Sequence, residues 1–134
     1  MIPNNLIVLS SPRLDGGNTG ANVYAFVLPL KIAIDRVVVT TEAVLTSNLH
    51  VSCDSYVGTT QGAEDIASIE LAASAVIFEA AYDEVAKGTV LKAGDAILVQ
   101  VDNAGDSGEN FQVHVVCKAY DERPDNMTGM LESA

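Results

Sequence analysis

The stretch that decides the fold class is Gly94-Asp95-Ala96-Ile97-Leu98-Val99-Gln100-Val101-Asp102. A Gly-Asp turn leads into an apolar run rich in β-branched residues, and turn-forming residues follow it, which is the pattern of a strand bounded by turns. Alternate positions of a strand share a face. One face therefore carries Ile97, Val99 and Val101, and the other carries Ala96, Leu98 and Gln100. We expect a half-buried β-strand here.

A second run, residues 111–119, alternates in the same way and collects Phe111, Val113, Val115 and Cys117 on one side. The segment between the two runs, 103–109, is rich in Asn, Asp, Gly and Ser, which favour turns. The pattern predicts that the two runs pair as an antiparallel hairpin. Because a hairpin cannot shield its own apolar face, the rest of the chain must cover it. The residues thus indicate an all-β domain.

The composition narrows the classes of partner. The chain has 134 residues, a length typical of one domain, and its formal charge is −11, from 18 acidic and 7 basic residues. Nucleic acids and anionic lipid surfaces both require clustered Lys and Arg, so we expect neither as a partner. No apolar run approaches the ~20 residues of a membrane-spanning helix. The charge also favours solubility at high local concentration.

Two further segments leave alternatives open. Ile32 and Ile34 share the even face whereas Val37 and Val39 share the odd one, so the alternation slips at Asp35-Arg36. The slip predicts either a β-bulge or a corner between two sheets.

Residues 58–65 are expected to form a polar loop. The stretch 66–82 fits a helix by its Ala and Glu content, and it also fits two strands.

Three regions are expected along the chain: an N-terminal arm at 1–21, a β-sandwich at 22–120 and a tail at 121–134. Pro, Asn and Gly punctuate the arm, which therefore has no core of its own. Its one apolar run is Leu6, Ile7, Val8 and Leu9. Such a run can satisfy its backbone and side chains by adding to the sheet edge of a neighbouring subunit. Deleting residues 1–20 is expected to leave the sandwich folded.

No metal or cofactor is expected. His50 and Cys53, and likewise His114 and Cys117, have the residue types of a zinc site. Positions three apart on a strand point to opposite faces, however, so neither pair can converge on one ion. The two cysteines are predicted to be free, buried thiols, although a bridge between them is an open alternative. The acidic segment 102–109 offers oxygen ligands, yet it does not match a calcium-binding EF-hand loop.

No catalytic motif is present: the chain lacks a nucleophile elbow, a phosphate loop and a dinucleotide fingerprint, so we expect no enzyme. The order of its runs instead resembles a group of known proteins. The segments that carry the likeness are Leu28-Pro29-Leu30-Lys31-Ile32-Ala33-Ile34-Asp35-Arg36-Val37-Val38-Val39, then Leu49-His50-Val51-Ser52-Cys53 before Gly58, then Leu91-Lys92-Ala93-Gly94-Asp95-Ala96-Ile97 and a Val-rich last strand. This layout is similar to small tailed-bacteriophage head proteins, namely capsid decoration (cement) proteins and the base domains of head fibers.

The resemblance implies a jelly-roll-like antiparallel β-sandwich on the outer capsid surface, often a homotrimer, bound to the major capsid protein. It also implies strands within 66–82, with a break near Ser74 and with Tyr82 on a buried face. Leu98 and Val116 would then point outward on the two hairpin strands and form one apolar contact patch. The expected place is the virion, assembled in the host cytoplasm.

The expected function is that of a decoration protein that stiffens the head. The alternative, from a different class, is a carbohydrate- or receptor-binding module of a phage fiber. That alternative needs an exposed aromatic platform or a bound calcium ion, and the chain has no Trp and only four Tyr residues.

Overall fold

The computed structural model describes residues 6–15, 22–42, 44–45, 48–72, 80–84, 86–103 and 110–119, and the described chain is built of strands. Ten strands occur in this order: β1 (Leu6–Ser10), β2 (Leu14–Asp15), β3 (Asn22–Val27), β4 (Ile32–Thr41), β5 (Leu49–Val57), β6 (Thr60–Leu71), β7 (Ala80–Asp83), β8 (Val90–Leu91), β9 (Ala96–Asn103) and β10 (Asn110–Ala119). Within these residues there is no helix that is long and apolar enough to cross a membrane.

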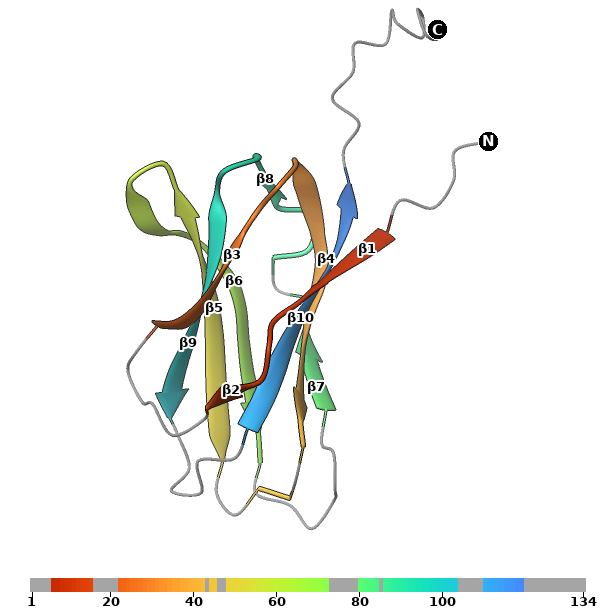
Figure 1. Ribbon diagram of the computed structural model, residues 1–134, viewed down its shortest axis with the longest axis vertical. Helices are drawn as coiled ribbons and strands as arrows, with labels where there is room; N and C mark the ends of the chain where they lie inside the picture. The colour runs from red at the N-terminus through yellow and green to blue at the C-terminus, as the bar shows by residue number, and fades with distance from the viewer. Residues whose placement is uncertain are drawn as a thin grey trace, which may run out of the picture.

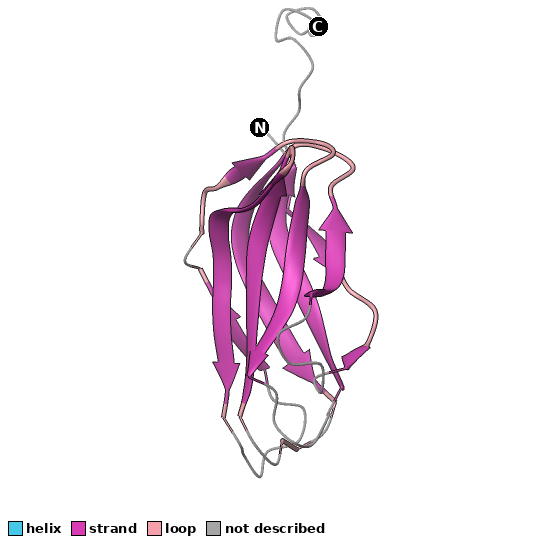
Figure 2. Cartoon of the chain, turned by 90° about the vertical axis from the view of Figure 1, so that its left-hand side faces the viewer, coloured by secondary structure: helices cyan, strands magenta, loops and turns pink. Residues whose placement is uncertain are grey.

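The strands form two sheets that face each other (Figures 1 and 2). Sheet A has the order β1-β10-β4-β7, with short β2 beside β10 and short β8 beside β4; sheet B has the order β3-β9-β5-β6. Four antiparallel pairs show how the chain is wrapped: β1 with β10, β3 with β9, β4 with β7, and β5 with β6. The first strands along the chain pair with the last ones, and the middle strands pair with each other. This is a long hairpin rolled into two sheets, a jelly roll.

The core lies between the sheets and follows the predicted alternation. Every second residue of the central strands points inward and is fully buried, as in Val99 and Val101 of β9 and Val113 and Val115 of β10. Packing two such faces removes a continuous apolar layer from water, which is the main force holding the sandwich together. The predicted all-β, jelly-roll-like sandwich is therefore confirmed.

The predicted hairpin between residues 96–102 and 111–119 is wrong. β9 lies in the middle of sheet B, whereas β10 lies in the middle of sheet A, so the connection between them crosses from one sheet to the other. The alternation correctly predicted which side chains are buried. It could not predict the pairing, because two strands whose apolar faces are buried together can be neighbours in one sheet or can face each other from two packed sheets. β10 pairs instead with β1 and β4.

The slip at Asp35-Arg36 is a β-bulge. Val116 of β10 pairs with Arg36 and the next residue, Cys117, pairs with Ile34, so Asp35 is the extra residue of β4. The bulge lets Ile34 and Val37 both face the core although they are an odd number of positions apart. The corner alternative does not apply, because β4 stays in sheet A along its whole length.

Residues 66–71 are strand, as the resemblance implied, and so are residues 80–83; the expected break near Ser74 lies outside the described residues. The polar loop predicted at 58–65 is wrong. The turn is only Gly58-Thr59, and β6 begins at Thr60. Gly58 has a φ of 61°, and a positive φ at the first position is what the tight two-residue hairpin turns, types I′ and II′, require.

The N-terminal segment is not an arm separate from the sheets. β1 pairs with β10 of its own chain in an unbroken register, and Leu14 of β2 is buried in the core. Ile7 and Leu9 pack against the same core. The apolar residues that were expected to seek a neighbour's sheet edge complete an edge of sheet A instead, because that edge lies within reach. The tail at 121–134 lies outside the described residues.

Candidate interaction surface

The outer face of sheet A carries a broad set of apolar side chains. Cross-strand pairing aligns them in rows: Leu6, Lys118, Ala33 and Val90; then Val8, Val116 and Arg36; then Ser10, His114, Val38 and Tyr82. Tyr82 is 62% exposed and Val8 is 57% exposed. Paired residues share a face and touch along a row. We call this set, from β1 to β7, the outer face of sheet A (Figure 1).

The six residues predicted to make contacts separate into three groups. Leu6, Val8 and Val116 lie on the outer face of sheet A. Ile7 and Leu9 alternate with them on β1, so their side chains turn inward and pack against the core. Leu98 is on β9 and points outward from sheet B. Leu98 and Val116 therefore lie on opposite faces of the sandwich, and the predicted single patch containing both is wrong.

Tyr82 was predicted to be buried, and this too is wrong. It pairs with outward-facing Val38, and the guanidinium of Arg36 lies 5.4 Å from the centre of its ring. A cation over an aromatic face is an attractive contact that leaves the ring edge exposed. The outward position of Arg36 and Val38 could be predicted from the sequence, because the slip in the apolar alternation at Asp35-Arg36 moves both residues to the outer face. For Tyr82 no such signal exists.

A network of ion pairs surrounds the bulge. Asp35 accepts a hydrogen bond from Arg36 Nε at 3.1 Å and lies 3.7 Å from Lys87 Nζ. Glu84 lies 3.7 Å from Arg36 and 3.6 Å from Lys87. The hydrogen bond from Arg36 lowers the pKa of Asp35, and the same contact raises the pKa of Arg36. These charges fix the side chains at one border of the outer face.

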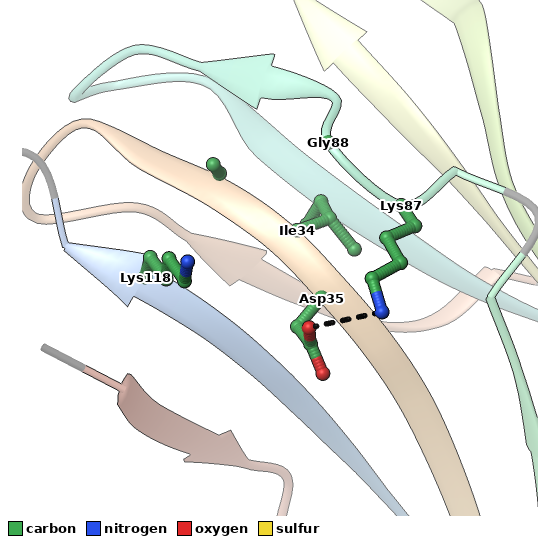
Figure 3. A pocket seen from close by; sticks show the side chains of 6 residues that line it. Ile34, Asp35, Lys87, Gly88 and Lys118 are labelled. Atoms are coloured by element: carbon green, nitrogen blue, oxygen red, sulfur yellow. Dashed lines mark ion pairs between the residues drawn. The ribbon is translucent and has the colours of Figure 1, made fainter. Parts of the chain in front are cut away.

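A shallow pocket of about 240 Å³ opens beside this network (Figure 3). Its lining includes Asp35, Lys87 and Lys118, and its floor is closed by backbone pairing. The Gly88 N–H donates to the Ile34 carbonyl at 2.7 Å, and the Ile34 N–H donates to the Thr89 carbonyl at 2.8 Å. The lysines come from two segments far apart in sequence, so the fold gathers positive charge at this border of sheet A.

The two histidines lie on outer faces, opposite to their cysteines, as strand geometry predicted. His114 is within hydrogen-bonding distance of the hydroxyls of Ser10, at 2.9 Å, and Thr40, at 3.1 Å. His50 is 2.8 Å from the hydroxyl of Ser68. Cys53 and Cys117 are buried, free thiols. Within the described part of the chain no group of three His, Cys, Asp or Glu residues is placed to hold a metal ion.

Burial also sets the titration of two of these groups. Partial burial lowers the pKa of His114, because the charged ring would lose hydration. Burial raises the pKa of the Cys117 thiol to about 11 for the same reason. Cys117 is therefore an inert, protonated side chain of the core at neutral pH. The acidic segment 104–109, considered as a cation site, lies outside the described residues.

Sheet B presents a different outer surface. Its four strands contain no Lys or Arg, while β5 and β6 carry Asp54, Glu64, Asp65 and Glu70. Asp54 and Asp65 help to line a second shallow pocket of about 300 Å³, together with Asp83 of β7. Asp83 accepts a hydrogen bond from the Ser68 N–H at 2.9 Å and so joins the edges of the two sheets. Among the described residues, the strands of sheet B thus carry only acidic charged groups, whereas the outer face of sheet A combines apolar side chains with Arg36 and Lys118 and has Asp35 and Glu84 at its border.

Comparisons with known proteins complete the description. No protein-family model matches the chain, and no curated protein matches it. Among solved structures, the tobacco streak virus coat protein dimer is similar over 94% of this chain and 95% of that chain, with 12% sequence identity and a TM-score of 0.38. The assignment of this chain as a jelly roll rests on its own strand pairing.

Proposed function

We propose that this protein is a structural component of a virion that attaches to the outer capsid surface and stabilises the head. The observation that carries the proposal is the outer face of sheet A, which combines exposed Leu6, Val8 and Tyr82 with half-buried Val116. Contiguous exposed apolar surface marks a site of contact with another protein. The partner would be the major capsid protein.

Two further observations support a structural role. Jelly rolls with this strand pairing are an architecture of viral capsid domains. The charge is divided between the faces, so the acidic outer face of sheet B suits the side turned to solvent, and the face bearing Arg36 and Lys118 suits the side turned to a partner. Attachment would act by burying surface, without chemistry, and the protein would join the head during assembly in the host cytoplasm.

Symmetric self-association is part of the proposal. Trimers are what the likeness to decoration proteins implies, although the patch of Leu98 and Val116 that would have formed the trimer contact does not exist. The apolar residues available for a subunit contact are those of the outer face of sheet A and of β1. Sedimentation of the full-length protein measures the copy number directly.

The test is co-sedimentation with assembled heads of the parent virus. Val116→Asp and Tyr82→Asp replace apolar surface on the outer face of sheet A by a charge, and each is expected to weaken head binding at least about tenfold, because the carboxylate would lose its hydration when the face is buried against a partner. Val27→Asp is the matched control, since Val27 is 69% exposed on sheet B. All three variants must keep the melting temperature of the wild type. Equal binding by all three would refute the proposal.

A second candidate, a carbohydrate-binding module, draws on one observation. The ring of Tyr82 is exposed beside Arg36, and an exposed aromatic ring is what a sugar stacks upon. Jelly rolls also occur among lectin domains. Binding on a glycan array that is lost in Tyr82→Ala would favour this function over the first.

A further inference from the structure

In the described chain, the longer edge strands of the two sheets are β1 and β7 of sheet A and β3 and β6 of sheet B, besides the two-residue strands β2 and β8. Three of these four longer strands are protected against pairing with another chain. Unpaired backbone groups at an edge can bind any extended strand, and proteins block this with charges, bulges or covering groups. On β6 the protection is Glu64, Asp65 and Glu70, and the Ser68 N–H is already bonded to Asp83. On β7, which is only four residues long, Asp83 points inward.

The edge at β3 is protected by shape. Its pairing with β9 shifts between Asn22 and Tyr24, so the edge is bulged and does not offer an even row of backbone groups. Pro29 follows two residues after the strand ends.

Among the described residues, β1 itself carries none of these devices. Leu6–Ser10 contains no charge, no Pro and no Gly, and its register with β10 is unbroken. In a protein with a net charge of −11, it is a segment along which two copies can approach without bringing carboxylates together. Its exposed side chain at the centre, Val8, is apolar.

The direction of the backbone groups on β1 follows from Ser11, the residue that comes directly after the strand. The Ser11 N–H donates to the carbonyl of Val113, its partner in the continued register, at 2.9 Å. Because bonded and non-bonded pairs alternate in an antiparallel ladder, Leu9 and Ile7 also direct their backbone groups toward β10. The N–H and C=O of Val8 then point to the open side of the sheet.

We infer that β1 is a contact between two copies of this chain, in which β1 of one copy pairs antiparallel with β1 of the other about a two-fold axis at Val8. The geometry is self-complementary. Val8 faces Val8 of the partner subunit, and Ile7 faces Leu9 of the partner subunit on the core side. The two copies of sheet A become one continuous sheet, and their apolar outer faces join. This inference rests on the self-association in the proposed function and names its contact, and it does not depend on capsid binding, because it needs only a second copy.

The experiment follows the Val8 amide in ¹⁵N-labelled full-length protein between about 10 μM and about 1 mM, a range suited to a small interface. Hydrogen exchange at Val8 should slow at least tenfold as the concentration rises, while sedimentation reports conversion of monomer to dimer. Exchange at Leu9, which is already bonded within the chain, should not change with concentration.

Val8→Pro tests the pairing itself. Proline removes only the outward N–H, so β1 stays paired with β10 and the melting temperature should stay near that of the wild type. The variant should remain monomeric at the highest concentration. Val8→Lys, which places like charges opposite each other across the axis, is a second test should proline disturb the fold, and it should weaken association at least tenfold. Val27→Lys on sheet B is the matched control and should dimerise like the wild type.

Three results would overturn the inference: a wild-type protein that is monomeric throughout the range, a Val8→Pro dimer, or loss of the dimer in Val27→Lys, which would place the contact at β3. Tyr82→Asp separates this contact from the proposed function, because Tyr82 lies on β7, at the opposite edge of sheet A from β1. This variant should lose head binding and keep the dimer.

Discussion

Ser11 directly follows β1 and makes two hydrogen bonds through its side-chain hydroxyl. Its side chain is 3% exposed, accepts the Val113 N–H at 3.0 Å and donates to the Pro12 carbonyl at 2.7 Å. The chain turns away at Pro12, so the hydroxyl takes the place that the next ladder bond would have had. A buried backbone N–H depends on it.

Replacing Ser11 by Ala should lower the free energy of unfolding by about 1–3 kcal/mol, because the Val113 N–H would stay buried without an acceptor. Urea denaturation measures the change. Ser10→Ala removes an exposed hydroxyl on the neighbouring residue and should stay within about 0.5 kcal/mol of the wild type. Equal effects of the two substitutions would contradict this account.

His114 should make the fold sensitive to mild acid. Its pKa is lowered in the folded protein, so below the ordinary value of 6.5 the unfolded chain binds a proton more readily than the folded one. Stability should therefore fall as pH decreases from 6.5 toward the folded-state pKa. The groups that face the ring from β1 and β4 are the uncharged hydroxyls of Ser10 and Thr40. His114→Gln should flatten the dependence of the melting temperature on pH in this window, and an unchanged slope would assign it to other groups.

Among the elements, the turn before β9 is specified most tightly by its residues. Asp95 N–H donates to the Lys92 carbonyl at 3.1 Å, the Asp95 carboxylate accepts the Lys92 N–H at 2.9 Å, and Gly94 has a φ of 92°. A positive φ at the third position makes this a type II turn. The turn also exchanges backbone hydrogen bonds with Leu28 at 2.9 Å and so holds the end of β3.

Gly94→Ala should destabilise the protein by about 1–3 kcal/mol through backbone strain. A Cβ at Gly94 would meet nothing within 4 Å, so steric crowding does not contribute. Gly94→Asn should cost less, since Asn tolerates a positive φ better. Thermal melting of the two variants provides the comparison, and a larger loss for Asn would show that something other than φ matters there.

Strand faces could be predicted from the sequence far better than strand partners. Alternation placed Val99, Val101 and Val113 in the core and located the bulge at Asp35, because period-2 burial is a local property. Nothing local distinguishes a β9–β10 hairpin from a crossing between sheets, and that choice is made by the whole set of pairings. The face of Tyr82 was missed because parity cannot be counted from β6 to β7 without the course of residues 73–79.

The candidate surface was predicted in part for the same reason. Leu6, Val8 and Val116 were found because each is an apolar residue at an outward position of an alternating run. Lys87 was not, since its contact with Asp35 depends on β4 meeting the turn before β8. The two segments are far apart in the sequence but adjacent in sheet A.

At the scale of the molecule, the structure reverses the expectation for an N-terminal deletion. Removing residues 1–15 takes away β1 and the buried Leu14 and leaves one side of β10 without its partner. The melting temperature should fall by about 5 °C or more, and the uncovered edge should promote aggregation. Removing residues 1–5 alone keeps β1 and is the control. A deletion of 1–15 that melts like the wild type would restore the view of this segment as a dispensable arm.

The place of β10 between β1 and β4 has a consequence for the order of events during synthesis. All four strands of sheet B precede β10 in the sequence. A chain synthesised only as far as residue 103 therefore contains the whole of sheet B but lacks a central strand of the sheet that covers its apolar face. Sheet A at that stage lacks β10, and β1, the first strand to be synthesised, has no strand to pair with until β10, the last, has been made. A message cut short before residue 110 would therefore yield a half-built sandwich that exposes its core, a species suited to aggregation or proteolysis rather than to assembly.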